Sequence, residues 1–261
     1  MRILRVYILA SAVLLGTLFA QEEAEENLRD TLRLRDLPWA EKELQSIASV
    51  VKSELYLRGD ATEAAFKKNA GRFGIIHLAQ HVILDDKEPL YSKFIFSDSP
   101  GSGEDGYLHL YELYNLRLRA NMVVLSACQT GIGKNIKGEG MMSLARGFTY
   151  SGCPSVVMSL WSIDDKATSV IITDFYRKLA QGKPKDVALR DAKLNMIQSG
   201  DPVLSNPYYW SGLVVIGSTE SLEIPPPENF ISYRIYATAV IVSILVLLIL
   251  IGIKRMKSVS H

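Results

Sequence analysis

A histidine and a cysteine each follow an apolar segment of strand type, and together these two side chains can carry out nucleophilic chemistry. His81 comes after the segment 73–79, and Cys128 follows hydrophobic residues of the segment 122–127. Because parallel strands end at one edge of their sheet, residues far apart in sequence can become neighbours there. An imidazole can take the thiol proton and later protonate a leaving amine. An ordinary buried cysteine at a strand end fits the same pattern, so both interpretations stand at this point.

The turn after Cys128 contains Gly131 and Gly133. Its backbone N–H groups can point inward, where they would hold the oxyanion of a tetrahedral intermediate. The turn lacks the full spacing of a phosphate-binding loop, so loop flexibility explains its glycines better than nucleotide binding does. Asp164 and Asp165 follow a further strand-type segment and are expected at the same edge of the sheet.

The histidines and cysteines do not predict a metal site, and no organic cofactor is required. His77 precedes His81 by one helical turn in sequence. On a strand, however, these two side chains stand too far apart for one metal, and no glutamate follows His77 as the metalloprotease motif requires. His77 is therefore expected in the core or next to the site. Cys153 is expected to fill the core, and a disulfide between Cys153 and Cys128 is the competing interpretation.

Strand-type segments alternate with amphipathic stretches along the middle of the chain, which is typical of a mostly parallel sheet covered by helices on both faces. The expected strands are 73–79, 93–96, 122–127, 155–160 and 213–216, and the expected helical regions are 36–68, 110–115, 139–150, 166–179 and 185–198. The 261 residues are 48% apolar and 22% charged, which excludes a disordered chain. With 29 basic against 28 acidic residues, no net field attracts nucleic acid.

Both ends of the chain carry uncharged apolar runs. A basic start, an apolar run and a small residue at Ala20 predict a secretory signal peptide over residues 1–20. The uncharged run 235–253 is long enough to span a bilayer and predicts a transmembrane helix. Lysines and arginines follow it in the tail 254–261, and such residues are retained on the cytoplasmic side. The preceding domain is therefore expected at the cell membrane, facing the periplasm or the exterior.

A set of short motifs along the chain fits one known family. The first reads HLAQH at 77–81, and the second reads LSACQTGIG at 125–133. Further matching stretches are 138–140, 144–148, 159–165, 175–176, 207–210 and Gly217. In this order the motifs resemble those of CHAT domains, caspase-like cysteine peptidases often found beside tetratricopeptide repeats and related to separases and gingipains.

The resemblance implies a caspase-like α/β fold, a three-layer sandwich in which helices flank a mostly parallel sheet. It implies that His81 is the general base and Cys128 the nucleophile, with the backbone N–H groups of Val82 and Cys128 forming the oxyanion hole. In related enzymes an acidic residue after the Ser-Leu-Trp strand lines the primary specificity pocket. The substrate-binding residues implied in this way are Asp165, or else Asp164, together with Trp161 and Ser126.

The complete domain organisation predicted from the sequence has six parts. They are a signal peptide (1–20), a short acidic linker (21–35), a CHAT domain (36–218), a Pro-rich spacer (219–234), a transmembrane helix (235–253) and a short basic cytoplasmic tail (254–261). Two residues depart from the family pattern, since Val82 stands where a glycine is expected and Gln80 replaces the usual threonine. A β-branched residue at 82 restricts φ and crowds the approach to its amide, so we expect it to weaken activity.

The function predicted from these features is that of a membrane-anchored cysteine endopeptidase that cleaves a protein or peptide substrate. One alternative is a catalytically weak or inactive caspase-like module that binds a peptide or protein partner without cleaving it. The other is an acyltransferase, because acyl transfer uses the same thioester intermediate. A tetratricopeptide-repeat protein is an expected partner or regulator, the membrane is reached through the C-terminal helix, and nucleic acid is not an expected partner.

Overall fold

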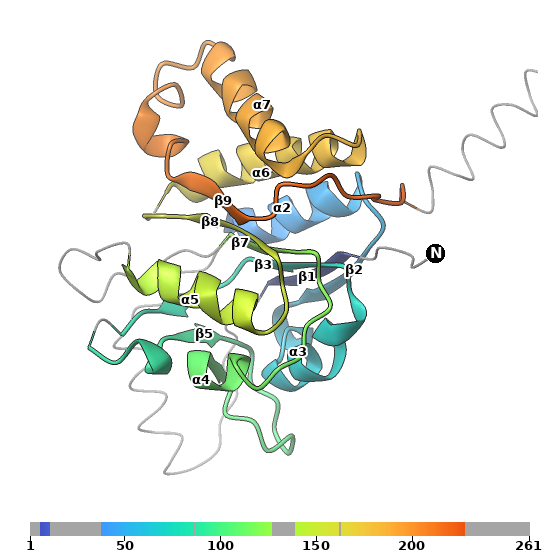
Figure 1. Ribbon diagram of the computed structural model, residues 1–261, viewed down its shortest axis with the longest axis vertical. Coiled ribbons are helices and arrows are strands. Elements are labelled where there is room, and N and C mark those ends of the chain that lie inside the picture. The colour runs from blue at the N-terminus through green and yellow to red at the C-terminus, as the bar shows by residue number, and fades with distance from the viewer. Residues whose placement is uncertain (1–5, 11–37, 86, 127–138, 162, 228–261) are drawn as a thin grey trace, which may run out of the picture. The chain divides into compact units, whose positions relative to one another are not determined.

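The computed structural model describes residues 6–10, 38–85, 87–126, 139–161 and 163–227 (Figure 1). The chain divides into two units, residues 1–225 and 226–261, and only Pro226 and Pro227 of the second are among the described residues. All elements below belong to the first unit.

A six-stranded sheet lies at the centre of this unit, with the strand order β2-β1-β3-β7-β8-β9. Its strands are β1 (Val6–Ala10), β2 (Ser53–Leu57), β3 (Ile75–Leu78), β7 (Met122–Leu125), β8 (Ser155–Ser159) and β9 (Leu213–Gly217). Neighbouring strands pair in parallel except β9, which is antiparallel to β8. Every residue of β3, β7 and β8 is buried, as expected for parallel strands covered on both faces.

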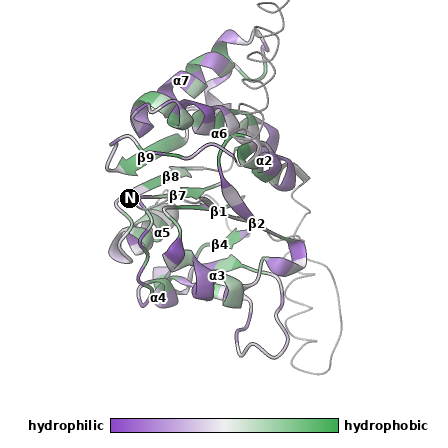
Figure 2. Ribbon diagram, turned by 90° about the vertical axis from the view of Figure 1, so that its right-hand side faces the viewer, coloured by the Kyte–Doolittle hydropathy of each residue, from purple (hydrophilic) through white to green (hydrophobic). Residues whose placement is uncertain are grey.

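Helices cover the two faces of the sheet in separate layers (Figure 1). One layer holds α2 (Pro38–Ala48), α6 (Asp165–Ala180) and α7 (Lys185–Gln198), and the other holds α3 (Glu63–Asn69), α4 (Leu110–Leu113) and α5 (Glu139–Tyr150). Strands β7, β8 and β9 consist mainly of hydrophobic residues, whereas helices α3 and α7 also contain many hydrophilic residues (Figure 2). The prediction of an α/β sheet flanked by helices is confirmed.

Side chains of the central strands alternate between two apolar cores. Ile75, Met122 and Val124 belong to the core under α2 and α6. Ile76 and Val123 belong to the core under α5, on the other face. Residues of odd number on β3 and of even number on β7 therefore point toward α2 and α6, which places the polar side chains discussed below.

A second, three-stranded antiparallel sheet lies on the α5 side of the molecule. Its order is β4-β5-β6, with β4 (Val82–Ile83), β5 (Lys93–Ile95) and β6 (Tyr107–His109). Of these strands only β5 was expected from the sequence. Short 3-10 helices complete the described elements, at Arg58–Asp60, Ala70–Arg72, Pro89–Tyr91 and Pro207–Tyr209.

Two sequence-based assignments at the N-terminal end are wrong for the residues that the structure describes. Residues Val6–Ala10, assigned to a signal peptide, form strand β1 between β2 and β3. A segment that is cleaved off cannot supply an interior strand, so the fold begins before the predicted domain start at 36. The second error concerns Ser53–Leu57, which lies in the region expected to be helical and forms strand β2 instead.

Within the described ranges, none of the helices combines the length and the apolar character that a membrane span requires. The predicted transmembrane span 235–253 and the basic tail 254–261 lie outside the described residues, as does the acidic linker 21–35.

Candidate functional site

The two strands that precede the predicted dyad lie side by side and end at the same level. Leu78, the last residue of β3, pairs with Leu125, the last residue of β7. The backbone N–H of Ser126 donates to the carbonyl of Leu78 over 2.9 Å, which extends the pairing by one residue. The chain therefore leaves both strands at one point of the sheet edge, as the sequence predicted.

His81 follows β3 at this edge and is 5% exposed. Its carbonyl oxygen accepts a hydrogen bond from the backbone N–H of Ile95 at 3.0 Å, so β5 fixes the backbone that carries the imidazole. Cys128 and the turn 127–138 lie outside the described residues. The distance between the imidazole and the thiol therefore stays a prediction.

The predicted oxyanion-hole residue Val82 has its side chain in the core. This side chain is 1% exposed and belongs to the core under α5. Arg58 is the one non-glycine residue with positive φ in the described part of the chain, so Val82 does not adopt a glycine conformation. Val82 of β4 pairs with Phe94 of β5, and the preceding residue His81 accepts the hydrogen bond from Ile95. Hydrogen-bonded and non-hydrogen-bonded pairs alternate along an antiparallel ladder, so the N–H of Val82 points away from β5. The effect of Val82 on activity stays a prediction.

Gln80, the other departure from the family pattern, is a fully buried amide beside His81. In the described part of the chain neither its Oε1 nor its Nε2 has a hydrogen-bond partner. Leaving a buried amide unsatisfied costs about 1–3 kcal/mol of stability. Gln80 is therefore an unsatisfied buried amide next to the proposed base in sequence.

A buried polar network lies behind the strand ends, on the α2 and α6 side. The Glu43 carboxylate of α2 accepts a hydrogen bond from the Ser126 hydroxyl at 3.1 Å through Oε2. Its Oε1 is 2.9 Å from Nε2 of His77, although the pair is not aligned as a hydrogen bond. The Nδ1 atom of His77 lies 3.2 Å from the hydroxyl of Tyr176 on α6. The expectation that His77 is a core histidine is confirmed, since it is 0% exposed.

Of the residues expected to bind substrate, Ser126 follows β7 and the other three follow β8. Asp164 caps α6, because its Oδ1 accepts from the backbone N–H of Ala167 at 3.0 Å. Asp165 is the first residue of α6 and is half-buried. Trp161 is exposed, and its indole N–H donates to the carbonyl oxygen of Tyr208 at 3.1 Å. Asp164 and Ser126 thus already have hydrogen-bond partners, in the backbone N–H of Ala167 and the carboxylate of Glu43.

The second cysteine, Cys153, is a free and buried thiol. Burial raises the pKa of Cys153 to about 12, and the thiol donates to the carbonyl oxygen of Ser155 at 3.4 Å. A thiol protonated at neutral pH inside a core is inert. The prediction that Cys153 fills the core is confirmed.

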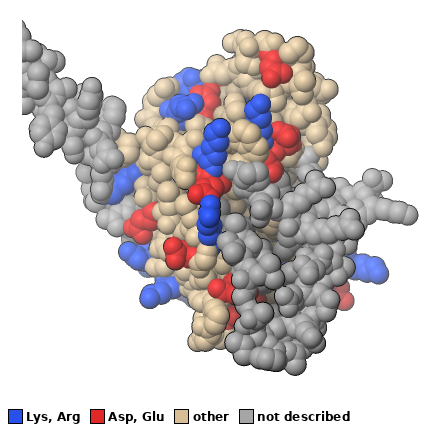
Figure 3. All heavy atoms as spheres, turned by 180° about the vertical axis from the view of Figure 1, so that it is seen from behind, with Lys and Arg blue, Asp and Glu red and all other residues tan. Residues whose placement is uncertain are grey.

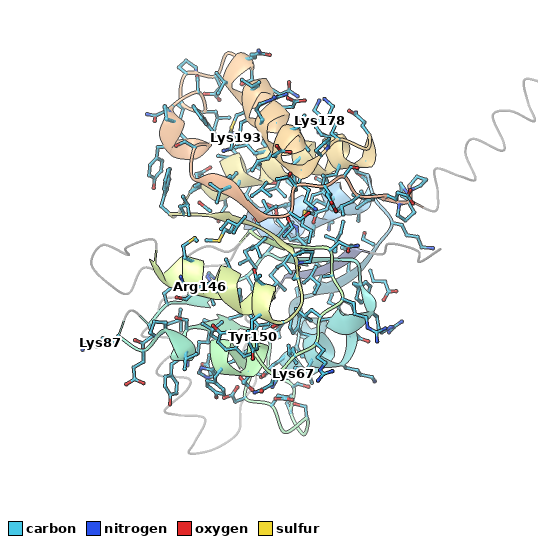
Figure 4. All side chains as sticks on the ribbon, in the orientation of Figure 1. Lys67, Lys87, Arg146, Tyr150, Lys178 and Lys193 are labelled. Atoms are coloured by element: carbon cyan, nitrogen blue, oxygen red, sulfur yellow. The ribbon has the colours of Figure 1, made fainter. Side chains whose placement is uncertain are left out.

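One group of three carboxylates among the described residues is close enough to hold a cation, namely Glu63, Glu104 and Glu112. A lysine supplies that cation. The Nζ atom of Lys67 lies 2.6 Å from Glu63, 2.6 Å from Glu104 and 2.8 Å from Glu112. Lys67 lies on α3 and is labelled in Figure 4, and the cluster ties α3 to α4 rather than forming a metal site.

On the face shown in Figure 3, basic and acidic side chains are interspersed and do not gather by sign. An interspersed surface gives no extended positive stripe for a phosphate backbone.

Comparison with known proteins places the chain in a family. The family model of the CHAT domain matches residues 7–218. Tetratricopeptide repeat protein 28 from Mus musculus and from Homo sapiens is 32% identical to this chain over 114 residues, which is 44% of this chain and 4% of each relative. The matched part thus spans a small fraction of those relatives.

Among solved structures, the Arg-specific cysteine proteinase gingipain R is similar over 84% of this chain and 46% of its own chain. The TM-score is 0.43 and the sequence identity 10%. The family match also starts at residue 7, in agreement with the position of β1 in the sheet. The resemblance seen in the sequence motifs is therefore confirmed, and the chain belongs to the CHAT domain family.

Proposed function

We propose that this protein is a membrane-anchored cysteine endopeptidase in which His81 is the general base and Cys128 the nucleophile. The observation that carries the proposal is the register of β3 and β7, which brings the two strand ends together at Leu78 and Leu125. Membership of the CHAT family, whose motifs place a histidine and a cysteine at these positions, supports the assignment.

The chemistry follows from the two side chains. His81 takes the proton of the Cys128 thiol, and the thiolate attacks the carbonyl carbon of the scissile peptide bond. The oxyanion of the tetrahedral intermediate is held by the backbone N–H groups of Val82 and Cys128. The imidazolium then protonates the leaving amine, and water hydrolyses the thioester with His81 again acting as base.

The proposed specificity pocket lies at the start of α6. The Asp165 carboxylate would pair with a basic side chain on the acyl side of the cleaved bond, because charge-assisted hydrogen bonds favour arginine or lysine. Trp161 would form an apolar wall, since its exposed ring is held by the bond to Tyr208. Asp164, which caps α6, is the second choice for the same pocket.

We further propose that the chain is anchored in the cell membrane by residues 235–253, with the domain on the side opposite the basic tail. The uncharged run and the basic residues after it support this topology. A partner with tetratricopeptide repeats is proposed from the similarity to tetratricopeptide repeat protein 28.

The second candidate function is a module that binds a peptide or protein without cleaving it. Gln80 favours this candidate, because its buried and unsatisfied amide lies next to the proposed base. An amide in this place is a departure from the family pattern beside the general base, and a base held about 1 Å from its productive position would slow acyl transfer about 100-fold.

Peptide hydrolysis by the purified full chain separates the two functions. Fluorogenic peptides with arginine, lysine, leucine or aspartate before the cleaved bond are tested against wild type, Cys128→Ala and His81→Ala. The matched controls are Cys153→Ser, at a buried inert thiol, and His109→Ala, whose Nδ1 lies against the carbonyl of Tyr91. Cleavage after basic residues that only the first two variants abolish supports the peptidase. Peptide binding without any cleavage supports the binding module.

A further inference from the structure

A single carboxylate joins the two strands that lead to the proposed dyad. Glu43 uses one oxygen for each strand, since Oε1 lies 2.9 Å from the ring of His77 on β3 and Oε2 accepts from Ser126 just after β7. His81 follows His77 on the same segment, and Cys128 follows Ser126 by two residues in sequence. The carboxylate of Glu43 thus bridges the chain segments that carry the base and the nucleophile.

Packing alone does not account for an acidic residue at this position. Glu43 is 2% exposed and stands next to Leu44, in a core formed by apolar residues of α2, α6, β3 and β7. Burying an isolated carboxylate is costly unless it is paired and hydrogen-bonded. Within the described ranges the carboxylate of Glu43 contacts the imidazole of His77 and the hydroxyl of Ser126, so its stabilising contacts are the ones that cross between the strands.

The network continues to α6 and ends there. The hydroxyl of Tyr176 contacts His77 at 3.2 Å, and the two rings lie with centroids 5.7 Å apart. Burial raises the pKa of Tyr176 well above its usual value, and the nearby Glu43 adds to this. Tyr176 therefore stays protonated and holds the ring of His77 in place.

The order of groups excludes a second nucleophile in this network. In a catalytic triad the imidazole lies between the hydroxyl and the carboxylate. Here the carboxylate of Glu43 lies between the Ser126 hydroxyl and the imidazole of His77. Ser126 is therefore a hydrogen-bond donor to Glu43 rather than an activated serine.

We infer that Glu43 is a positioning residue, which holds the Ser126 end of β7 against β3 and so sets the position of Cys128 relative to His81. This inference rests on the proposed function and adds a residue that does not touch the substrate. Displacement of a reacting group by about 1 Å can lower a rate about 100-fold, so a clamp on both strand ends has a direct kinetic effect.

The test measures alkylation of Cys128 by iodoacetamide in the full chain, with the modified peptide identified by mass spectrometry. Glu43→Gln and Ser126→Ala should each slow alkylation about tenfold, because a displaced thiol loses its ion pair with His81. Ser126→Thr keeps the hydroxyl and should restore the rate. The double variant Glu43→Gln/Ser126→Ala should be no slower than either single variant, since both remove one interaction.

The matched control is Glu41→Gln, on the same helix, where the carboxylate bonds the partly exposed Arg58 at 2.9 Å. This variant should alkylate at the wild-type rate. Wild-type rates in both Glu43→Gln and Ser126→Ala, with only the melting temperature lowered, would overturn the inference and leave Glu43 a structural residue. If Glu43→Gln does not fold, Ser126→Ala against Ser126→Thr decides the question by itself.

The same variants separate this inference from the proposed function, because iodoacetamide needs no peptide groove. Alkylation that depends on His81 but not on Glu43 leaves the endopeptidase proposal intact and removes the positioning role. Alkylation that depends on both residues, with no peptide cleaved, keeps the positioning role and contradicts the endopeptidase. In the peptidase assay, Glu43→Gln should lower kcat and leave KM near its wild-type value, because Glu43 does not contact substrate.

Discussion

Leu78 and Leu125 pair in register at the ends of the parallel strands β3 and β7. This relationship brings together two chain segments that carry the histidine and the cysteine of the sequence motifs. The catalytic account depends on it, since a dyad forms only where both strand ends meet. Glu43 reinforces the pairing from the α2 side through His77 and Ser126.

Replacement of Lys67 by methionine should destabilise the fold by about 2–4 kcal/mol, because it leaves the buried Glu63 without its cation. The expected loss in the free energy of unfolding is smaller than for a fully buried ion pair, because Glu104 and Glu112 keep contact with solvent. Urea unfolding at neutral pH measures it. Lys68→Met, at an exposed position of the same helix, is the control and should change the free energy of unfolding little.

The Lys67 variant also predicts a pH dependence. Burial raises the pKa of Glu63, while its hydrogen bond to Lys67 lowers it. When the pKa of a carboxyl group is higher in the folded state than in the unfolded state, the group stabilises the fold at a pH below the unfolded-state pKa. This stabilisation is lost as the pH rises through the folded-state pKa. Without Lys67 the pKa of Glu63 rises further. The difference in the free energy of unfolding between Lys67→Met and wild type should therefore shrink as the pH falls to about 4 or below. A difference that is the same under acidic and neutral conditions would contradict the assignment of Lys67 as partner of Glu63.

Gln80→Met should leave the fold as stable as wild type or stabilise it by about 1–2 kcal/mol, because it replaces an unsatisfied buried amide with an apolar side chain of similar shape. Thermal and urea unfolding measure the change. The control is Gln45→Met on the exposed side of α2. Strong destabilisation by Gln80→Met alone would mean that the amide makes an essential contact.

Gly152→Ala should cost at least about 2 kcal/mol of stability. Gly152 has a φ of +102°, and a Cβ there would lie 2.7 Å from the carbonyl oxygen of Leu118. Gly182 offers a matched comparison, because its φ is +80° and no heavy atom lies within 4 Å of the position that a Cβ would take. Gly182→Ala should therefore cost only the conformational strain, about 1 kcal/mol. Equal losses in the two variants would show that the contact with Leu118 is unimportant.

Deletion of residues 1–20 should prevent formation of the folded domain, because it removes strand β1 from between β2 and β3. The measurement is cooperative unfolding of the truncated chain, followed by circular dichroism, beside the mass of the N-terminal peptide of the protein purified from cells. We expect that peptide to include Val6. A mature chain that begins after Ala20 and still unfolds cooperatively would contradict the position of β1.

The sequence was most informative where strands are buried on both faces. The apolar runs 73–79, 122–127 and 155–160 contain β3, β7 and β8, because a strand covered on both faces needs apolar side chains throughout. The run 213–216 contains most of β9, an edge strand that is mainly half-buried. Strand β2 was missed since Ser53–Leu57 is only half-buried and mixes polar with apolar residues. Strand β1 was misread because an apolar run beside arginines is also typical of an export signal.

The position of the proposed base was predicted from the sequence, but the buried residue Glu43 behind the strand ends was not. The motifs located His81, and the topology confirms that its strand ends beside that of Ser126. Glu43 was missed because an acidic residue on a helix is usually solvated. One signal could have identified it, since Glu43 stands four residues before the buried Ile47 and so lies on the apolar stripe of α2. Its partners could not be predicted, as they come from β3 and β7 through tertiary packing.

The central claim is tested most directly by mapping the covalent adduct formed with an electrophilic peptide that carries arginine next to its reactive group. Full-length wild type, Cys128→Ala and His81→Ala are treated, and the modified residue is identified by mass spectrometry. We predict one adduct, on Cys128, which is lost in Cys128→Ala and at least about 100-fold slower in His81→Ala. An adduct on Cys128 that forms equally fast without His81, or no adduct with any peptide, would contradict the dyad.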